Sequence, residues 1–248
     1  MRLLRQLGRQ SNGLALLGCA LSLVSCGTHP AFVESTYKVQ RIAYGKINVD
    51  GVADESVWDQ ANSLLPAIGS PWRNKNPQNT EFKALWDGST LYYSFILVDA
   101  DKVSLRDIEN ELDIGREDRV EIFIANIDRD FGCDLRQYIG LETDYSGRVI
   151  DFTAIPYRQF DFSWTAQTHS VASNVAGNSI VVEGAIAIEE LAQLGVSPAE
   201  PSQLNVGVFR GDFSSLTASE PEWLSWVDPE TPQPDFHVCS AFGVFRLE

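Results

Sequence analysis

The sequence has few basic residues, and this lack excludes several classes of partner. It holds 19 Lys and Arg against 34 Asp and Glu, which gives a formal net charge of −15 over 248 residues. Nucleic-acid binding needs an excess of basic side chains for phosphate contacts, so we expect no nucleic-acid partner. The same deficit argues against attachment to anionic lipid through basic patches. Disorder of the whole chain is excluded, because 44% of the residues are hydrophobic and 10% are aromatic.

Recognisable catalytic signatures are also missing. The histidines His29, His169 and His237 are isolated and lack the spacing of a zinc site. The chain has no G-x-S-x-G nucleophile motif and no glycine-rich phosphate loop. A glycosidase needs two carboxylates at set separations, but among 34 acidic residues some pair will meet that condition by chance. A non-catalytic protein is therefore favoured over an enzyme.

No apolar run is long enough to span a bilayer comfortably, but a shorter run lies near the N-terminus. Three arginines within the first nine residues precede the apolar residues 13–24. The run ends in Leu-Val-Ser-Cys-Gly at residues 23–27, which resembles a bacterial lipobox, where cleavage precedes the cysteine and its thiol is lipidated. An ordinary signal peptide with a chance cysteine and a buried apolar helix are the alternatives.

These N-terminal features predict the organisation of the chain. We expect a lipoprotein signal peptide over residues 1–25, a tether over 26–36 that is lipid-anchored at Cys26, and one domain over 37–248. Gly27 is not the aspartate that is linked to inner-membrane retention of lipoproteins. The expected product is an exported lipoprotein of the cell envelope, anchored at the outer membrane.

Only four cysteines are present, and they divide between two expected fates. Cys19 leaves with the signal peptide and Cys26 takes the lipid, so Cys133 and Cys239 remain. An even pair in an exported protein predicts a disulfide. Two separate, buried, reduced thiols are the alternative.

The rest of the chain is dominated by short segments rich in β-branched and aromatic residues. Strands are expected over residues 82–86, 91–98, 119–125, 137–143, 149–154, 162–171, 180–188, 204–209 and 242–247. Asp87-Gly88 between the first two is a strong hairpin signal. Short helices are expected over 54–61, with Asp54 as N-cap, and over 189–194, before Gly195. The pattern favours an all-β fold: an antiparallel β-sandwich with one or two short helices.

Four segments, in order along residues 40–248, resemble the family 9 carbohydrate-binding modules. They are Val49–Trp58 (DG-x-x-D-E-x-x-W), Ala84–Asp87 followed by Leu91-Tyr92, Asp118–Ile124 (D-x-VEIFI), and the closing section that contains Ser225-Trp226 and Phe242-Gly243. The resemblance implies an immunoglobulin-like or jelly-roll-like β-sandwich related to DOMON domains. It also implies non-catalytic binding of sugar chains and structural calcium. Haem binding through methionine, known among DOMON relatives, is excluded because Met1 is the only methionine.

Candidate sugar contacts follow from the resemblance and from the chemistry of sugars, which needs flat aromatic rings and polar groups. By resemblance, Trp226 matches a stacking tryptophan and Glu121 matches a contact to sugar hydroxyls. Arg210 follows a strand and could donate two hydrogen bonds, or form a structural ion pair. Trp86 precedes a turn and is expected to be partly buried. Trp72, Trp164 and Trp223 lie near loops or strand ends and could line a groove. The full set of candidates is Trp226, Glu121, Trp86, Arg210, Trp72 and Trp164.

One position departs from the family pattern. Sugar-sandwiching members carry a second tryptophan three residues before the aspartate of D-x-VEIFI, where this chain has Gly115. Another ring replaces it, or the ligand differs, or the fold has been reused. The prediction is an envelope lipoprotein that binds polysaccharide or oligosaccharide and supports separate glycoside hydrolases. An accessory or degenerate glycoside hydrolase, and a scaffold that has lost sugar binding, are the alternatives.

The predicted saccharide binding requires no cofactor, but one acidic segment suits a structural Ca²⁺. Asp128, Asp130 and Asp134 offer three carboxylates within seven residues, and oxygen-rich loops bind calcium. A complete twelve-residue EF-hand loop is not present. A solvated acidic face is the alternative.

Overall fold

The computed structural model describes residues 35–65, 67–73, 79–105, 107–129, 133–198, 200–217 and 221–248. The predicted signal peptide, the lipidation site Cys26 and the calcium candidate Asp130 lie outside these residues. Among the described residues no helix combines the length and the apolar composition needed to cross a bilayer.

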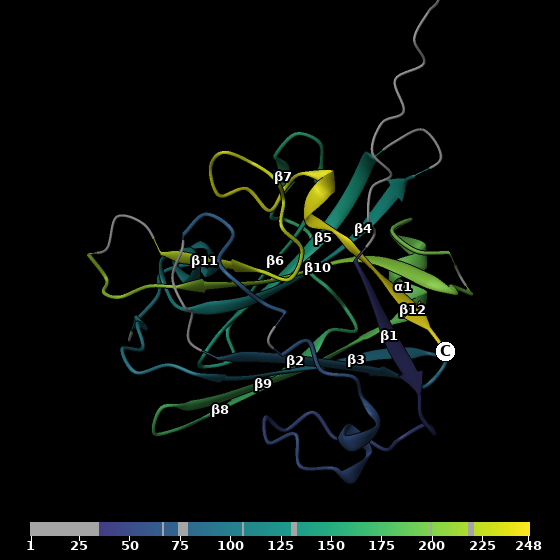
Figure 1. Ribbon diagram of the computed structural model, residues 1–248, viewed down its shortest axis with the longest axis horizontal. Coiled ribbons are helices and arrows are strands. Elements are labelled where there is room, and N and C mark those ends of the chain that lie inside the picture. The colour runs from purple at the N-terminus through teal and green to yellow at the C-terminus, as the bar shows by residue number, and fades with distance from the viewer. Residues whose placement is uncertain are drawn as a thin grey trace, which may run out of the picture. The chain divides into compact units, whose positions relative to one another are not determined.

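The strands form two layers (Figure 1). In pairing order, one layer contains β7 (Gln159–Asp161), β6 (Val149–Ile155), β5 (Asp134–Asp144), β4 (Arg119–Asp128), β10 (Gln203–Asp212) and β12 (Gly243–Leu247), with β11 (Glu222–Ser225) paired to β10. The other contains β2 (Thr80–Trp86), β3 (Thr90–Val98), β9 (Ser179–Ala187) and β8 (Ser170–Ala176). The predicted all-β fold is confirmed.

Strand β1 (Thr36–Arg41) joins the two layers. Its first four residues pair in parallel with β12, in the register Thr36↔Val244, and its last two pair in parallel with β2, in the register Gln40↔Leu85. Figure 1 shows β1 passing from one layer to the other. All other strand pairs within the described residues are antiparallel, so the predicted sandwich holds except at this junction.

The helices within the described residues are short. They are α1 (Ile188–Gln193) and three 3-10 helices over Ser56–Gln60, Glu111–Arg116 and Cys239–Ala241. The first 3-10 helix and α1 lie where short helices were predicted. Asp54 does not cap the first one: Glu55 holds that position, and its carboxylate accepts a hydrogen bond from the backbone of Asn48 instead.

The strand expected over residues 162–171 begins only at Ser170. Side-chain carboxylates take the backbone N–H groups that a strand ladder would need. Asp161 accepts from the N–H of Ser163, Asp151 accepts from Ala166, and Glu190 accepts from the next two residues. An N–H bound in this way is not available to a neighbouring strand.

Alternation along β4 divides the buried residues of this layer between two clusters. Val120, Ile122 and Ile124 enter an interlayer core that also contains side chains of β2, β3 and β10. Phe123 and Ala125 point to the opposite, outer face, because successive side chains of a strand alternate. Phe236, Ala241 and Phe242, from the segment 226–242, cover this outer face.

The Val49–Trp58 segment fastens the N-terminal part of the domain to β9. The backbone N–H of Gly51 and the indole N–H of Trp58 donate to the Glu183 carboxylate at 2.8 and 3.2 Å. Gly51 has φ +83°, and a Cβ there would lie 2.8 Å from the Ser173 backbone. This motif is therefore structural, and it packs over Leu85 and Tyr92.

The predicted disulfide between Cys133 and Cys239 is confirmed, with a Cα–Cα distance of 5.7 Å. It ties the residue before β5 to the end of the covering segment 226–242. The cover is thereby held against the outer face of β4 and β5.

Candidate functional site

A cavity of about 200 Å³ opens on the outer face, where β4, β5 and β11 meet the covering segment. Its lining comprises Arg119, Glu121, Glu142, Arg158, Trp223, Pro234, Asp235, Phe236 and His237. Strand register explains the floor: Glu121 of β4 stands opposite Glu142 of β5, and Gly211 of β10 stands opposite Trp223 of β11. The cavity thus joins residues that are up to 118 positions apart in the sequence.

Two acids share one arginine on the cavity floor. The Arg119 Nε lies 2.7 Å from Glu142 Oε2 and 3.0 Å from Glu121 Oε1. Its single hydrogen is directed at Glu142, and within the described residues Glu121 Oε1 has no hydrogen-bond partner. Glu121 is 2% exposed. A buried acceptor that is paired with a cation but accepts no hydrogen bond is costly, and it marks a position where a ligand donor would be favoured.

Aromatic rings form one wall of the cavity. The Arg119 guanidinium lies 5.2 Å from the centre of the Trp223 ring. Trp223 meets Phe236 edge to face, and Phe236 stacks on Phe209 with ring centres 4.0 Å apart. A Cβ on Gly211 would lie 3.0 Å from the Trp223 indole, so the glycine lets this ring lie close against the strand. The wall therefore offers two aromatic rings, Trp223 and Phe236, that are perpendicular to one another.

The rest of the cavity lining is polar. The His237 Nδ1 lies 2.9 Å from the Tyr138 hydroxyl, and burial lowers the pKa of His237 to about 4, so the imidazole is neutral near pH 7. Arg158 Nη2 donates to Asp235 Oδ1 at 3.1 Å, and the Tyr157 hydroxyl donates to Asp235 Oδ2 at 2.6 Å. Donors, acceptors and aromatic rings thus line one cavity, a combination that suits a small ligand with hydroxyl groups and apolar faces.

Of the six predicted sugar contacts, only Glu121 lines this cavity. Trp226 packs on the interlayer core, with ring centres 5.6 Å from Phe245 and 6.5 Å from Tyr37, and Trp164 packs on the same core. The structure therefore places neither tryptophan with Glu121.

The other three predicted contacts are also elsewhere. Trp86 donates its indole N–H to the Glu248 carbonyl at 3.1 Å. Trp72 packs behind the cavity wall and donates to the Thr231 carbonyl at 2.9 Å. Arg210 is 0% exposed and pairs with acids inside the domain. It therefore forms the structural ion pair that the sequence analysis gave as its alternative role.

Trp223 was one of several ring candidates, and its position is explained by strand alternation. On β11, Leu224 enters the interlayer core, so Trp223 faces outward. The signal that would have selected it is the pairing with Gly211, which no local pattern reveals.

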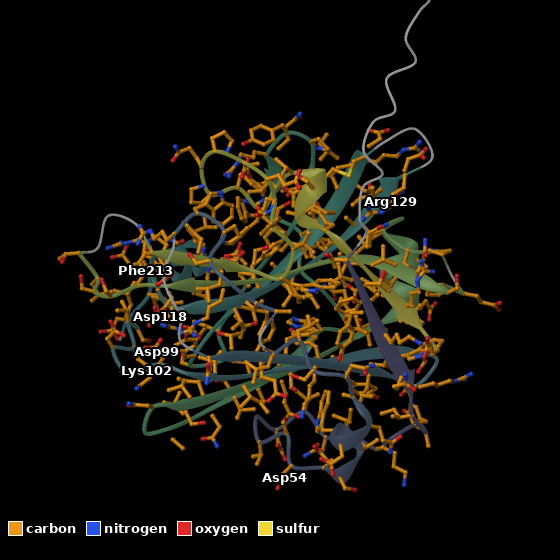
Figure 2. All side chains as sticks on the ribbon, viewed as in Figure 1. Asp54, Asp99, Lys102, Asp118, Arg129 and Phe213 are labelled. Carbon is orange, nitrogen blue, oxygen red and sulfur yellow. A yellow bond between two sulfur atoms is a disulfide. The ribbon has the colours of Figure 1, made fainter. Side chains whose placement is uncertain are left out.

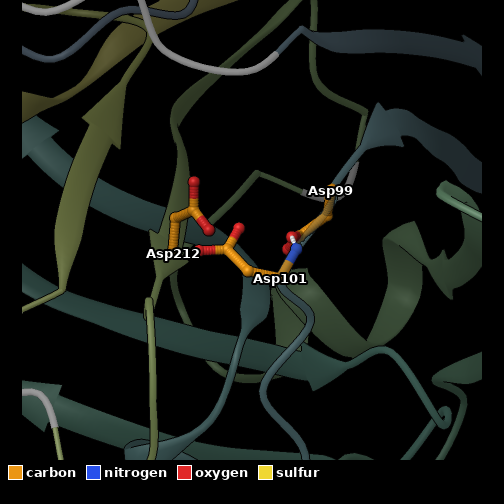
Figure 3. A group of neighbouring side chains, drawn as sticks. All are labelled: Asp99, Asp101 and Asp212. Atoms are coloured by element: carbon orange, nitrogen blue, oxygen red, sulfur yellow. Dashed lines mark hydrogen bonds between the residues drawn. The ribbon is translucent and has the colours of Figure 1, made fainter.

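A second acidic cluster contains Asp99, Asp101 and Asp212, whose ligand atoms all lie within 4.8 Å of one another (Figure 3). Arg210 Nη2 lies 3.1 Å from Asp99 and 3.4 Å from Asp212, so a cation of the chain itself already pairs with two of the three carboxylates. Asp118, which accepts from the Phe213 backbone, lies at the same end of the domain (Figure 2). Arg210 therefore competes with any bound cation for Asp99 and Asp212.

The calcium site predicted from Asp128, Asp130 and Asp134 stays a prediction. Asp130 lies outside the described residues. Arg136 Nη2 lies 2.5 Å from Asp128, and its Nε lies 3.6 Å from Asp134. The two described carboxylates thus share an arginine.

The buried acid on the cavity floor predicts a pH dependence of stability. Burial, and next the charge of Glu142, raise the pKa of Glu121 from its ordinary value of 4.5 to about 8. Between these values the folded state holds a proton that the unfolded state has lost, so the free energy of unfolding falls as the pH rises. We expect the thermal midpoint to fall from pH 6.5 to pH 8, and to fall less in Glu121→Gln, which stays neutral.

Scanning calorimetry at several pH values tests this expectation. The window begins at pH 6.5 because burial lowers the pKa of His169 and of His237 to about 4, and these histidines oppose the trend at lower pH. Asp118, whose pKa burial raises to about 7, contributes equally to both proteins. Glu109→Gln, at an exposed position, is the matched control. Equal slopes for wild type and Glu121→Gln would contradict the prediction.

Comparisons with known proteins identify a family and agree with the fold. The family described as "carbohydrate family 9 binding domain-like" matches residues 49–248. A crystal structure of a candidate carbohydrate-binding protein from Bacteroides uniformis is similar, with TM-score 0.63, 15% identity, and coverage of 87% of this chain and all of that one.

A family 9 carbohydrate-binding module from Caldicellulosiruptor kristjanssonii is similar in two complexes. The glucose complex has TM-score 0.56 and 15% identity, and covers 86% of this chain and 96% of that one. The cellotriose complex has TM-score 0.56 and 14% identity, and covers 86% and 94%. At such identities the likeness shows the fold. No match was found among curated proteins.

Proposed function

The chain belongs to the carbohydrate family 9 binding domain-like family, and from this membership we propose that its outer-face cavity binds one unit of a saccharide without catalysis. The observation that supports this most directly is the buried Glu121 Oε1, which lacks a hydrogen-bond partner within the described residues and lines the cavity together with an aromatic wall. A sugar hydroxyl supplies the donor that this oxygen lacks.

The proposed binding mode uses both the aromatic and the polar lining. The apolar C–H face of the sugar lies against Trp223, and its hydroxyls contact Glu121, Arg119 and Asp235. The volume of about 200 Å³ is below the range of about 300–1,000 Å³ typical of drug-sized ligands, and it suits a single ring. Hydrolysis is disfavoured, because Arg119 lies against both Glu121 and Glu142 where a glycosidic bond would have to enter.

Removal of the aromatic wall tests this proposal. Trp223→Ala is expected to weaken saccharide binding about 10–100-fold, because a central aromatic anchor contributes about 1.4–2.8 kcal/mol. Isothermal titration with glucose and with cellotriose measures the effect, after a glycan array has screened other sugars. Trp86→Ala, a tryptophan outside the cavity, is the matched control and should keep the wild-type affinity. Absence of binding to every glycan on the array, or equal losses in both variants, would contradict the proposal.

We further propose that the chain is exported, lipidated at Cys26 and anchored at the outer membrane, where it captures glycan for separate glycoside hydrolases. The Leu-Val-Ser-Cys-Gly sequence after an apolar run supports the anchor. Labelled palmitate should enter the wild-type chain and not Cys26→Ser. Incorporation that survives the substitution would overturn the lipidation.

A further inference from the structure

An exposed tyrosine lies at the edge of the cavity and is held there by polar contacts. Tyr157 follows β6 and is 59% exposed. Its hydroxyl donates to Asp235 Oδ2 at 2.6 Å and accepts from Arg158 Nε at 3.0 Å, and both partners line the cavity. A large exposed ring is usually free to rotate, whereas this one is fixed with much of its surface in solvent.

The backbone at this position is itself unusual. Arg158 has φ +59°, a left-handed conformation that costs a non-glycine residue about 1–2 kcal/mol. Such conformations persist where surrounding contacts impose them, and they cluster at ligand clamps. Here the Arg158 side chain is held by Asp235 and lies over the Tyr157 ring at 5.5 Å. The strained backbone of Arg158 is thus found where the Arg158 side chain holds the Tyr157 ring.

Exposed apolar side chains gather around the same hairpin. Ile155, Tyr157 and Phe162 are three of the large hydrophobic residues of the described chain that are more than a third exposed, and they fall within eight positions. Ile155 lines a different cavity, together with Gln159, and Phe162 packs edge to face on Phe152. Tyr157 is therefore the one of the three that contacts a residue of the polar cavity, through Asp235. A pyranose ring, with one apolar face and a rim of hydroxyls, matches an exposed ring flanked by an arginine.

We propose that Tyr157 forms a second subsite, so that the preferred ligand is a saccharide of at least two units, the first in the cavity and the second stacked on the Tyr157 ring beside Arg158. This inference rests on the proposed function of the cavity. It adds that chain length, and not the identity of a single sugar unit alone, determines affinity.

The experiment compares two probes, glucose and cellotriose, by isothermal titration of the full-length chain. Wild type should bind cellotriose at least tenfold more tightly than glucose. Tyr157→Ala should weaken cellotriose binding about tenfold, equivalent to about 1.4 kcal/mol, and change glucose binding less than twofold. Tyr157→Phe keeps the ring and should retain most of the cellotriose affinity. Tyr44→Ala is the matched control, because Tyr44 is 81% exposed and lies far from Tyr157 in the sequence. This variant should change the affinity for neither probe.

The outcomes separate this inference from the proposed function. Equal wild-type affinity for both probes, or a Tyr157→Ala effect that is equal for both or absent for both, would overturn the second subsite and leave the cavity proposal standing. If wild type bound neither glucose nor cellotriose, both the second subsite and the proposed function of the cavity would be overturned for glucose-based ligands. Because Tyr157 is exposed, the variants should keep the wild-type thermal midpoint, and this is checked in the same samples.

Discussion

Arg210→Met should destabilise the domain by about 3–5 kcal/mol, the range measured when one partner of a buried ion pair is removed. Arg210 and Asp99 are both 0% exposed and lie 3.1 Å apart, and Arg210 Nη1 also donates to Thr80 at 3.0 Å. Methionine fills a similar volume but leaves Asp99 and Asp212 facing each other without a cation. Two buried like charges must then take up protons or draw water into the core.

The loss should depend on pH in a defined direction. Burial already raises the pKa of Asp212 to about 6, although Arg210 opposes this rise. Without the arginine the pKa of Asp212 rises further, so the folded variant holds protons that the unfolded chain releases. The destabilisation is therefore expected to grow from pH 5 to pH 8.

Urea denaturation at pH 5 and pH 8 measures both effects. The control is Arg136→Met, which removes an arginine that is 55% exposed and pairs with Asp128 and Asp134 at the surface. Exposed pairs contribute about 0–1 kcal/mol, so this variant should be close to wild type. A decrease of less than about 1 kcal/mol in the free energy of unfolding of Arg210→Met would contradict the prediction and show that the ion pair between Arg210 and Asp99 is dispensable for stability.

The fold could be predicted from the sequence wherever a strand carries its own alternation. The strand β4 has Val120, Ile122 and Ile124 in one register and Glu121, Phe123 and Ala125 in the other. It was predicted over residues 119–125, with the correct start, and the structure extends it to Asp128. Strand β1 was not predicted, and its first pairing joins Thr36 to Val244, at the opposite end of the chain. A local pattern identifies a strand but not a distant parallel partner.

The site was less accessible to sequence reasoning. Glu121 was found because its motif surrounds it. Trp226 was preferred over Trp223, since only the paired strands reveal which ring faces outward. Arg210 was predicted to be able to contact sugar because the sequence does not show its partner: Asp99, which accepts its hydrogen bond, lies 111 positions away. Tertiary packing decides which charged groups pair and which rings reach the surface when these residues are far apart in the sequence, and composition and spacing do not reveal it.

Loss of the Cys133–Cys239 disulfide should lower the free energy of unfolding by about 3–4 kcal/mol. The bond joins residues 106 positions apart. In the chain-entropy account, closing a loop of about 100 residues restricts the unfolded chain by about 4.7 kcal/mol, and measured values are usually smaller. The expected variant is Cys133→Ser/Cys239→Ser, measured by urea denaturation.

The disulfide should matter for the cavity as well as for stability. Asp235, Phe236 and His237 lie two to four residues before Cys239, in the covering segment that the bond ties to β5. Releasing one end of this segment lets the wall open, so cellotriose binding should weaken about tenfold even at temperatures where the strands remain folded. Dithiothreitol should reproduce both effects in wild type and have no effect on the double serine variant. If fully reduced wild type, verified by mass, keeps its denaturation midpoint and its affinity, then the packing of Phe236 on Phe209 and the hydrogen bonds of Asp235 and His237 hold the wall in place without the disulfide.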